Sequence, residues 1–106
     1  MVTDILEAAG IKYKPVRFLT PPNETYAVYF DAQTHRGSDS SILIVDHEVT
    51  IELYSVKIDE VSEQAIENEL VKRGIEFLKD ERMWLDTEKL FEVVYTFDFT
   101  EKRRDS

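Results

Sequence analysis

The sequence contains no cysteine among its 106 residues. This absence excludes a disulfide framework and any catalytic or metal-binding thiol. Folding therefore needs no oxidising compartment, which is compatible with the cytosol. No run approaches the roughly 18 apolar residues of a transmembrane helix. The N-terminus also lacks the basic and apolar regions of a signal peptide. We expect a soluble intracellular protein that does not enter a membrane.

Basic residues are scarce as well, with 13 Lys and Arg against 22 Asp and Glu and a net charge of −9. Binding to nucleic-acid phosphates requires clustered Lys and Arg, so sequence-independent binding of DNA or RNA is disfavoured. An anionic membrane surface is disfavoured for the same reason. Solubility is the ordinary explanation of such a charge. An acidic lumen and a DNA-mimicking face are the alternatives.

Glycine and proline occur only three times each, so turn signals are few. A hydrophobic content of 42% with 11% aromatic residues is typical of a globular chain, and the length fits one modest core. We expect a single domain over residues 1–100 and a mobile polar tail over residues 101–106. The chain shows no internal repeat and no linker.

Two segments have the start and stop signals of helices. The first follows Thr3 and Asp4 and ends at Gly10. The second is capped by Asp59 or Ser62 and runs to about residue 73, just before a glycine. Its predicted apolar stripe consists of Val61, Ala65, Ile66, Leu70, Val71 and Arg73, and the glutamates expected in solvent are Glu63, Glu67 and Glu69. Glu69 and Arg73 are also predicted to form an i, i+4 ion pair.

A long hairpin is the most informative pattern in the chain. Residues 25–31 are rich in Tyr, Val and Phe and predict one strand, and residues 42–56 predict a second. The Gly, Ser and Asp of residues 32–41 predict an irregular loop, and long loops are usually functional or disordered. Period two places one row of the second strand toward the core: Leu43, Val45, His47, Val49, Ile51 and Leu53.

The end of this hairpin nearest the loop is apolar on both faces, because Ile42 and Ile44 interrupt the polar row. A partner surface and local packing both explain that pattern. We take residues 36–44 as a candidate interface, made of Arg36, Gly37, Ser38, Asp39, Ser40, Ser41, Ile42 and Ile44. Arg36 is positioned to pair with a carboxylate on a neighbour, or to remain solvated.

The remaining strands are predicted at residues 11–19, 75–78 and 91–99. The first contains Pro15, which confines it to a sheet edge, and the last alternates aromatic and polar residues. Between the second and third lies a charged connection over residues 79–89, whose Trp84 is either an interface anchor or a core residue. Together these elements predict an α+β fold: a mixed, mostly antiparallel sheet with a long hairpin and two helices packed on one face.

No residue constellation indicates catalysis, a metal or a cofactor. His47 in its apolar row is either a base, ligand or pH-sensitive contact, or a partly buried strand histidine bonded to a neighbour. His35 and Asp39 could join Asp31 or Asp46 around a metal, but their spacing matches no closed metal motif. The serines of the loop lack a fixed base, and no glycine-rich phosphate loop is present. We therefore expect a protein that is not an enzyme.

The order of elements and three segments resemble small phage and prophage tail-completion proteins. The segments are residues 26–29 (YAVY), 47–54 (HEVTIELY) and 90–97 (LFEVVYTF). This family includes the tail terminators and head-to-tail joining proteins of long-tailed phages. The resemblance extends over most of residues 3–99 and rests on structural patterns.

The resemblance implies a structural protein that assembles into a ring, commonly a hexamer. Such a ring caps the tail tube, and its partners are the tail tube protein and the head completion or connector protein. It implies a location at the head–tail interface of the virion, and in the host cytoplasm during assembly. Residues 36–41 would be the contact loop, with Ile42 and Ile44 as its apolar base. An acidic bore would let DNA pass without specific binding.

Two other functions remain open from the residues alone. A small acidic adaptor or inhibitor would bind a basic protein surface, and salt would weaken that binding. An enzymatic function would require His47 and Asp46 to line a pocket with a bound ligand. Light scattering separates a ring from a monomeric adaptor.

Overall fold

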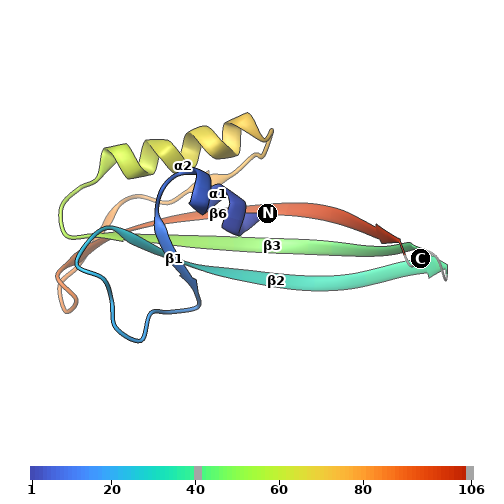
Figure 1. Cartoon of the computed structure of the whole chain (residues 1–106), viewed down its shortest axis with the longest axis horizontal. Helices are drawn as coiled ribbons and strands as arrows, with labels where there is room; N and C mark the ends of the chain where they lie inside the picture. Colours follow the sequence, from blue (N-terminus) through green and yellow to red (C-terminus); the bar gives the residue numbers. More distant parts are fainter. Residues whose placement is uncertain (40–41, 105–106) are drawn as a thin grey trace.

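Three long antiparallel strands run along the whole molecule: β2 (Tyr26–Asp39), β3 (Ile42–Ser55) and β6 (Leu90–Arg104) (Figure 1). The structure is a computed structural model that describes residues 1–39 and 42–104. Three short strands complete the sheet in the order β1-β2-β3-β6-β4, with β5 also paired to β6. These are β1 (Lys12–Pro15), β4 (Leu78–Lys79) and β5 (Met83–Leu85). Only β1 pairs in parallel, so the predicted mixed, mostly antiparallel α+β fold is confirmed.

Helices α1 (Val2–Ala8) and α2 (Glu60–Lys72) lie on the same face of this sheet (Figure 1). The strands offer their odd-numbered residues to that face, as period two predicts. Leu53 and Tyr95 are almost fully buried there, against Leu6 of α1 and Leu70 of α2. Burial of each such side chain contributes about 1.5–3 kcal/mol. This apolar core fixes the two helices on the sheet.

The predicted start of α2 and the predicted ends of both helices are confirmed. The predicted start of α1 was wrong: this helix begins at Val2, so Thr3 and Asp4 lie inside it and no side chain caps it. Asp59 is the N-cap of α2, and its carboxylate accepts a hydrogen bond from the Ser62 N–H at 3.0 Å. Gly10 and Gly74 follow the two helices with φ of 73° and 70°. This left-handed conformation costs glycine little, which explains why each helix stops at that point. The predicted pair between Glu69 and Arg73 is also present, at 3.3 Å.

The predicted stripe of α2 was partly wrong. Glu63 is only 4% exposed, whereas Val61 and Val71 are 82% and 69% exposed. The buried side of the helix follows Glu63, Ile66 and Leu70, which are spaced by three and four residues. Burial of the carboxylate is compensated by ion pairs from two cations of the following segment, Lys79 and Arg82, both at 2.9 Å.

The predicted loop over residues 32–41 was also wrong. β2 continues to Asp39 and pairs with β3 along its length, with a register shift between Arg36 and Asp39. The Gly, Ser and Asp composition indicates a turn when taken alone, but the backbone groups of this segment find partners in β3. Ser40 and Ser41 lie outside the described residues.

The last strand is longer than expected. We placed a polar tail from residue 101 onward, yet β6 continues to Arg104, which pairs with Ile42 of β3. The predicted edge strand over residues 11–19 is confirmed as the shorter β1. Of the predicted strand over residues 75–78, only Leu78 lies in a strand, β4. The charged connection contains β5, in which Trp84 remains 44% exposed beside Phe91.

The molecule measures 50 × 29 × 21 Å, and its length exceeds the part covered by the helices (Figure 1). We call the helix-covered part the body. Among the described residues, no helix has the length and apolar character needed to cross a membrane.

Candidate functional site

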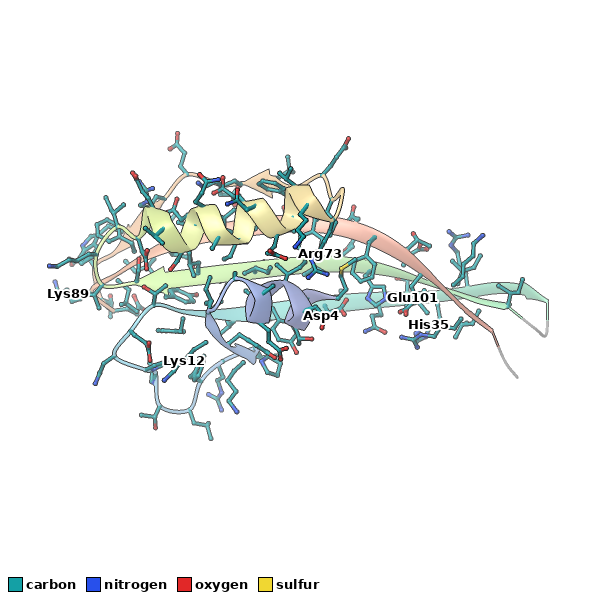
Figure 2. All side chains as sticks on the ribbon, turned by 45° about the horizontal axis from the view of Figure 1, so that its top comes forward. Asp4, Lys12, His35, Arg73, Lys89 and Glu101 are labelled. Carbon is teal, nitrogen blue, oxygen red and sulfur yellow. The ribbon has the colours of Figure 1, made fainter. Side chains whose placement is uncertain are left out.

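The three long strands project beyond the body as an arm. We define the arm as residues 31–39 of β2, 42–49 of β3 and 97–104 of β6, which are in register with one another. Figure 2 shows His35 and Glu101 toward this end of the molecule and Lys89 at the opposite end. β3 lies in the middle, so β2 and β6 form the two edges of the arm.

Both edges of the arm have free backbone groups. On β2, pairing with β1 extends no farther toward the arm than Tyr29. On β6, pairing with β4 extends no farther than Thr96. Beyond these points no strand within residues 1–39 and 42–104 covers either edge. An uncovered edge presents N–H and C=O groups that can pair with another chain.

A polar cluster ties the three strands together on the sheet face opposite the helices. In this Asp46 cluster, Arg36 of β2 donates to the Asp46 carboxylate of β3 at 2.7 Å. Thr100 of β6 donates its hydroxyl hydrogen to the same carboxylate at 2.7 Å. The hydrogen bond from Arg36, followed by that from Thr100, lowers the pKa of Asp46. The carboxylate therefore stays charged at neutral pH and joins all three strands.

A second polar cluster ties the same strands together on the helix-covered face. In this His47 cluster, the Nδ1 atom of His47 lies 2.8 Å from the Asp31 carboxylate of β2. Its Nε2 atom lies 2.7 Å from the Glu101 carboxylate of β6. The ring stacks on Phe99, with centroids 4.1 Å apart and planes inclined by 7°. The interpretation of His47 as a buried strand histidine bonded to neighbours is confirmed.

Burial and the two carboxylates act in opposite directions on this imidazole. Burial alone would lower the pKa of His47, but the hydrogen bonds with Asp31 and Glu101 outweigh it, so the pKa is raised above its ordinary value. Glu101 is affected reciprocally. Its hydrogen bond with His47, and a second one from Arg103 at 2.9 Å, lower the pKa of its carboxyl group.

The structure brings some of the candidate interface residues together. Arg36 and Ile44 pair across the hairpin, and Ile44 in turn pairs with Lys102 of β6. Arg36 contacts a carboxylate of its own chain, Asp46. The other described members also lie in the arm strands: Gly37, Ser38, Asp39 and Ile42.

The sequence did not identify Asp31 and Glu101 as the partners of His47, or Thr100 as a partner of Asp46. Each lies far along the chain from its partner, and Glu101 is 54 positions from His47. The available signal was His47 itself, because a titratable ring in an apolar row needs a polar partner. Among the residues that the structure describes, no group of three or more His, Asp or Glu side chains is placed to hold a metal.

A third polar cluster lies at the body end of the uncovered sheet face. The hydroxyl of Tyr54 lies 2.8 Å from the carboxylates of both Glu52 and Glu92. A phenol has one hydrogen, so it donates to one carboxylate at a time. Burial, then these two carboxylates, raise the pKa of Tyr54. Its ring stacks on Tyr26 with centroids 5.3 Å apart, so this end of the face is aromatic and acidic.

No protein-family model and no curated protein matches the chain. Among solved structures, the chain is similar to a chain from the virion of a native gene transfer agent (GTA) particle. The alignment covers 96% of this chain and 84% of that chain, with a TM-score of 0.56 and 10% sequence identity. A likeness at this identity concerns the fold.

Proposed function

We propose that this chain is a structural protein of a phage-like virion, and that it acts as a tail terminator and head-to-tail joining protein. The observation that carries the proposal is the fold likeness to a chain of a GTA virion, because it extends over 96% of this chain. In this role the protein forms a ring, commonly of six subunits. The ring caps the tail tube and presents a docking surface to the head connector, with no catalytic step.

The free edges of the arm support ring formation. The edge of β2 and the edge of β6 are different surfaces on opposite sides of the arm. A contact between two different surfaces is heterologous, and it repeats around a ring when the rotation closes. Strand pairing supplies such a contact through backbone hydrogen bonds alone.

The charge of the uncovered sheet face supports a bore through which DNA passes. Glu48 and Asp98 lie directly opposite one another on β3 and β6, and both are exposed. Like charges in directly opposed positions destabilise a sheet. In a bore, these opposed carboxylates would form an acidic lining that repels DNA phosphates. Such a lining accords with the net charge of −9.

The structure shows which residue to change at the β2 edge. Val16 donates to the carbonyl oxygen of Tyr29 at 3.0 Å, so the backbone groups of Tyr29 point away from β3. The backbone groups of successive residues in a strand point to alternate sides. Gln33 lies four residues after Tyr29, so its N–H also points away from β3. Gln33→Pro removes that N–H and leaves the pairing with β3 in place. Gln33→Thr keeps the N–H and is the matched control.

Multi-angle light scattering of the three proteins, alone and with tail-tube protein, tests the proposal. We expect a ring from the parent and from Gln33→Thr, and monomers from Gln33→Pro, with all three showing the same circular dichroism spectrum. A parent that stays monomeric at high concentration and with tail-tube protein present contradicts the ring. If Gln33→Pro still forms a ring, the β2 edge is not part of the contact between subunits.

The second candidate function is a small acidic adaptor that binds a basic protein surface. The observation in its favour is the acidic and aromatic surface around Tyr54, with Glu52 and Glu92 beside it. Such an adaptor remains monomeric or dimeric, and its affinity for a basic protein falls steeply as salt is added. The same light scattering measurement separates it from a ring.

A further inference from the structure

We propose that His47 is a proton-controlled clamp on the arm. Its side chain ties β2 and β6 to β3 when both ring nitrogens carry hydrogen, and it gives up its contact with one of the two outer strands when the ring loses a proton. This property goes beyond the proposed function, because it concerns the arm of a single chain. It holds whether or not the chain forms a ring.

The geometry requires two donors on one ring. Nδ1 faces Asp31 at 2.8 Å and Nε2 faces Glu101 at 2.7 Å. An ionised carboxylate only accepts hydrogen bonds, and a neutral imidazole has a single N–H. In the neutral ring, one nitrogen lone pair therefore points at a carboxylate oxygen. Only the imidazolium satisfies both contacts.

The surroundings of the ring prevent water from replacing a lost contact. His47 is 5% exposed, and its stacking on Phe99 fixes the plane of the ring. A buried polar atom left without a partner destabilises the fold, because its lost hydrogen bond to water is not replaced. Loss of the proton therefore leads to movement of a carboxylate away from the ring. Glu101 is the more exposed partner, at 37% against 21% for Asp31, so it is the side chain that moves.

The charged groups around the ring come from all three strands. β2 contributes Asp31, and β6 contributes Glu101 with Arg103 on its far side. β3 contributes the neighbouring Asp46, which points to the opposite face and is neutralised by Arg36. Within the described residues, α1 and α2 make no hydrogen bond or ion pair to the ring. The net field at the ring is negative and favours the imidazolium.

The clamp has two pH limits. A histidine whose pKa is raised on folding stabilises the fold below its unfolded pKa, and this contribution is lost as pH rises through the folded pKa. The carboxyl pKa of Glu101 is lowered, so its contribution is present above its unfolded pKa and is lost as pH falls through the folded value. The clamp is engaged between these limits, and on the alkaline side it opens as pH rises through the folded pKa of His47.

The chain offers a simple way to test this, because it has only two histidines. The His35→Gln variant removes the exposed one, so its only imidazole signals come from His47. NMR titration of this variant is expected to give a His47 midpoint above about 6.5. Adding Glu101→Gln is expected to lower that midpoint by about one pH unit, which corresponds to a tenfold change in proton affinity.

Amide hydrogen exchange reads the effect on the arm. The amides of Phe99 and Glu101 point toward β3, and their protection factors are expected to fall about tenfold between about pH 6 and pH 8.5. Amides of Val93 and Tyr95, in the body part of β6, are the internal reference and should not change. In His47→Gln the protection at the arm should no longer depend on pH.

The proposal is overturned by a His47 midpoint at or below about 6.5, or by an identical midpoint with and without Glu101→Gln. It is also overturned if His47→Gln keeps the pH dependence of its parent. Since Glu101 is partly exposed, the titration of Glu101→Gln supports or overturns the clamp even where His47→Gln does not fold.

Discussion

The body and the arm are built on the same three strands, yet different interactions hold them together. In the body the odd-numbered residues of β3 are covered by two helices, and Leu53 is 2% exposed. In the arm the same row of β3 reaches Leu43, which is only half-buried. Val45 and Val49 of this row are still buried in the arm, and toward the tip backbone pairing and the Asp46 and His47 clusters take over. The body should therefore respond to the removal of apolar volume, and the arm to pH and to edge contacts.

The largest expected difference comes from truncating the same residue type in the two regions. Leu53→Ala should lower the free energy of unfolding by about 3 kcal/mol, because it leaves a cavity under the helices. Leu43→Ala should cost less than about 1 kcal/mol, because solvent already reaches that side chain. Urea denaturation of both variants measures this. Equal losses would show that the arm is packed as tightly as the body.

The next largest effect is expected at the one buried carboxylate of α2. Glu63→Gln should cost about 2 kcal/mol, because hydrogen bonds from Lys79 and Arg82 lose their charged acceptor. Burial alone would raise the pKa of Glu63, but Arg82 and then Lys79 outweigh it, so the pKa is lowered. This stabilisation is present above the ordinary pKa of Glu and is lost as pH falls.

Glu60→Gln is the control for this variant, because Glu60 is exposed on the same helix. Denaturation at neutral pH and at about pH 4 should show a difference between the two variants that shrinks in acid. A constant difference at both pH values would mean that Glu63 acts through its shape rather than its charge.

In the body, the sequence alone was sufficient for most of the fold, because the decisive signals are local. Period two placed Leu53 in the core, and the glycines after each helix marked where the helices end. Glu63 was missed because a charged residue is normally assigned to solvent. Its spacing of three and seven residues from Ile66 and Leu70 was the overlooked signal.

In the arm, the sequence was a poorer guide, because the decisive contacts are remote. The Gly and Ser content of residues 32–41 favours a loop, and only pairing with β3 makes residues 32–39 a strand. His47 was identifiable as the unusual member of an apolar row. Its partners depend on the register of three strands, which no local pattern in this chain specifies.

A smaller effect is expected from pH alone. The stability of the parent should fall as pH rises from the ordinary pKa of histidine through the raised folded pKa of His47, where the ring loses its proton. His47→Gln should remove this slope and Glu101→Gln should reduce it, because Asp31 still raises the pKa of His47 in the second variant, whereas His35→Gln should keep it. Chemical denaturation across this pH range provides the measurement. A slope that survives in His47→Gln would place the titrating group elsewhere in the chain.

The smallest effect is expected at the Asp46 cluster, although it spans the same three strands as the His47 cluster. Arg36 is 60% exposed, and exposed ion pairs contribute little because water and salt screen them. Arg36→Ala should therefore change the free energy of unfolding very little, and the change should vanish in about 1 M salt. Arg36→Lys, which keeps the charge, is the matched control in the same denaturation series. A cost as large as that of Glu63→Gln, or one that persists in salt, would mean that the arm excludes water on both faces. The contrast between its two clusters would then no longer follow from their exposure.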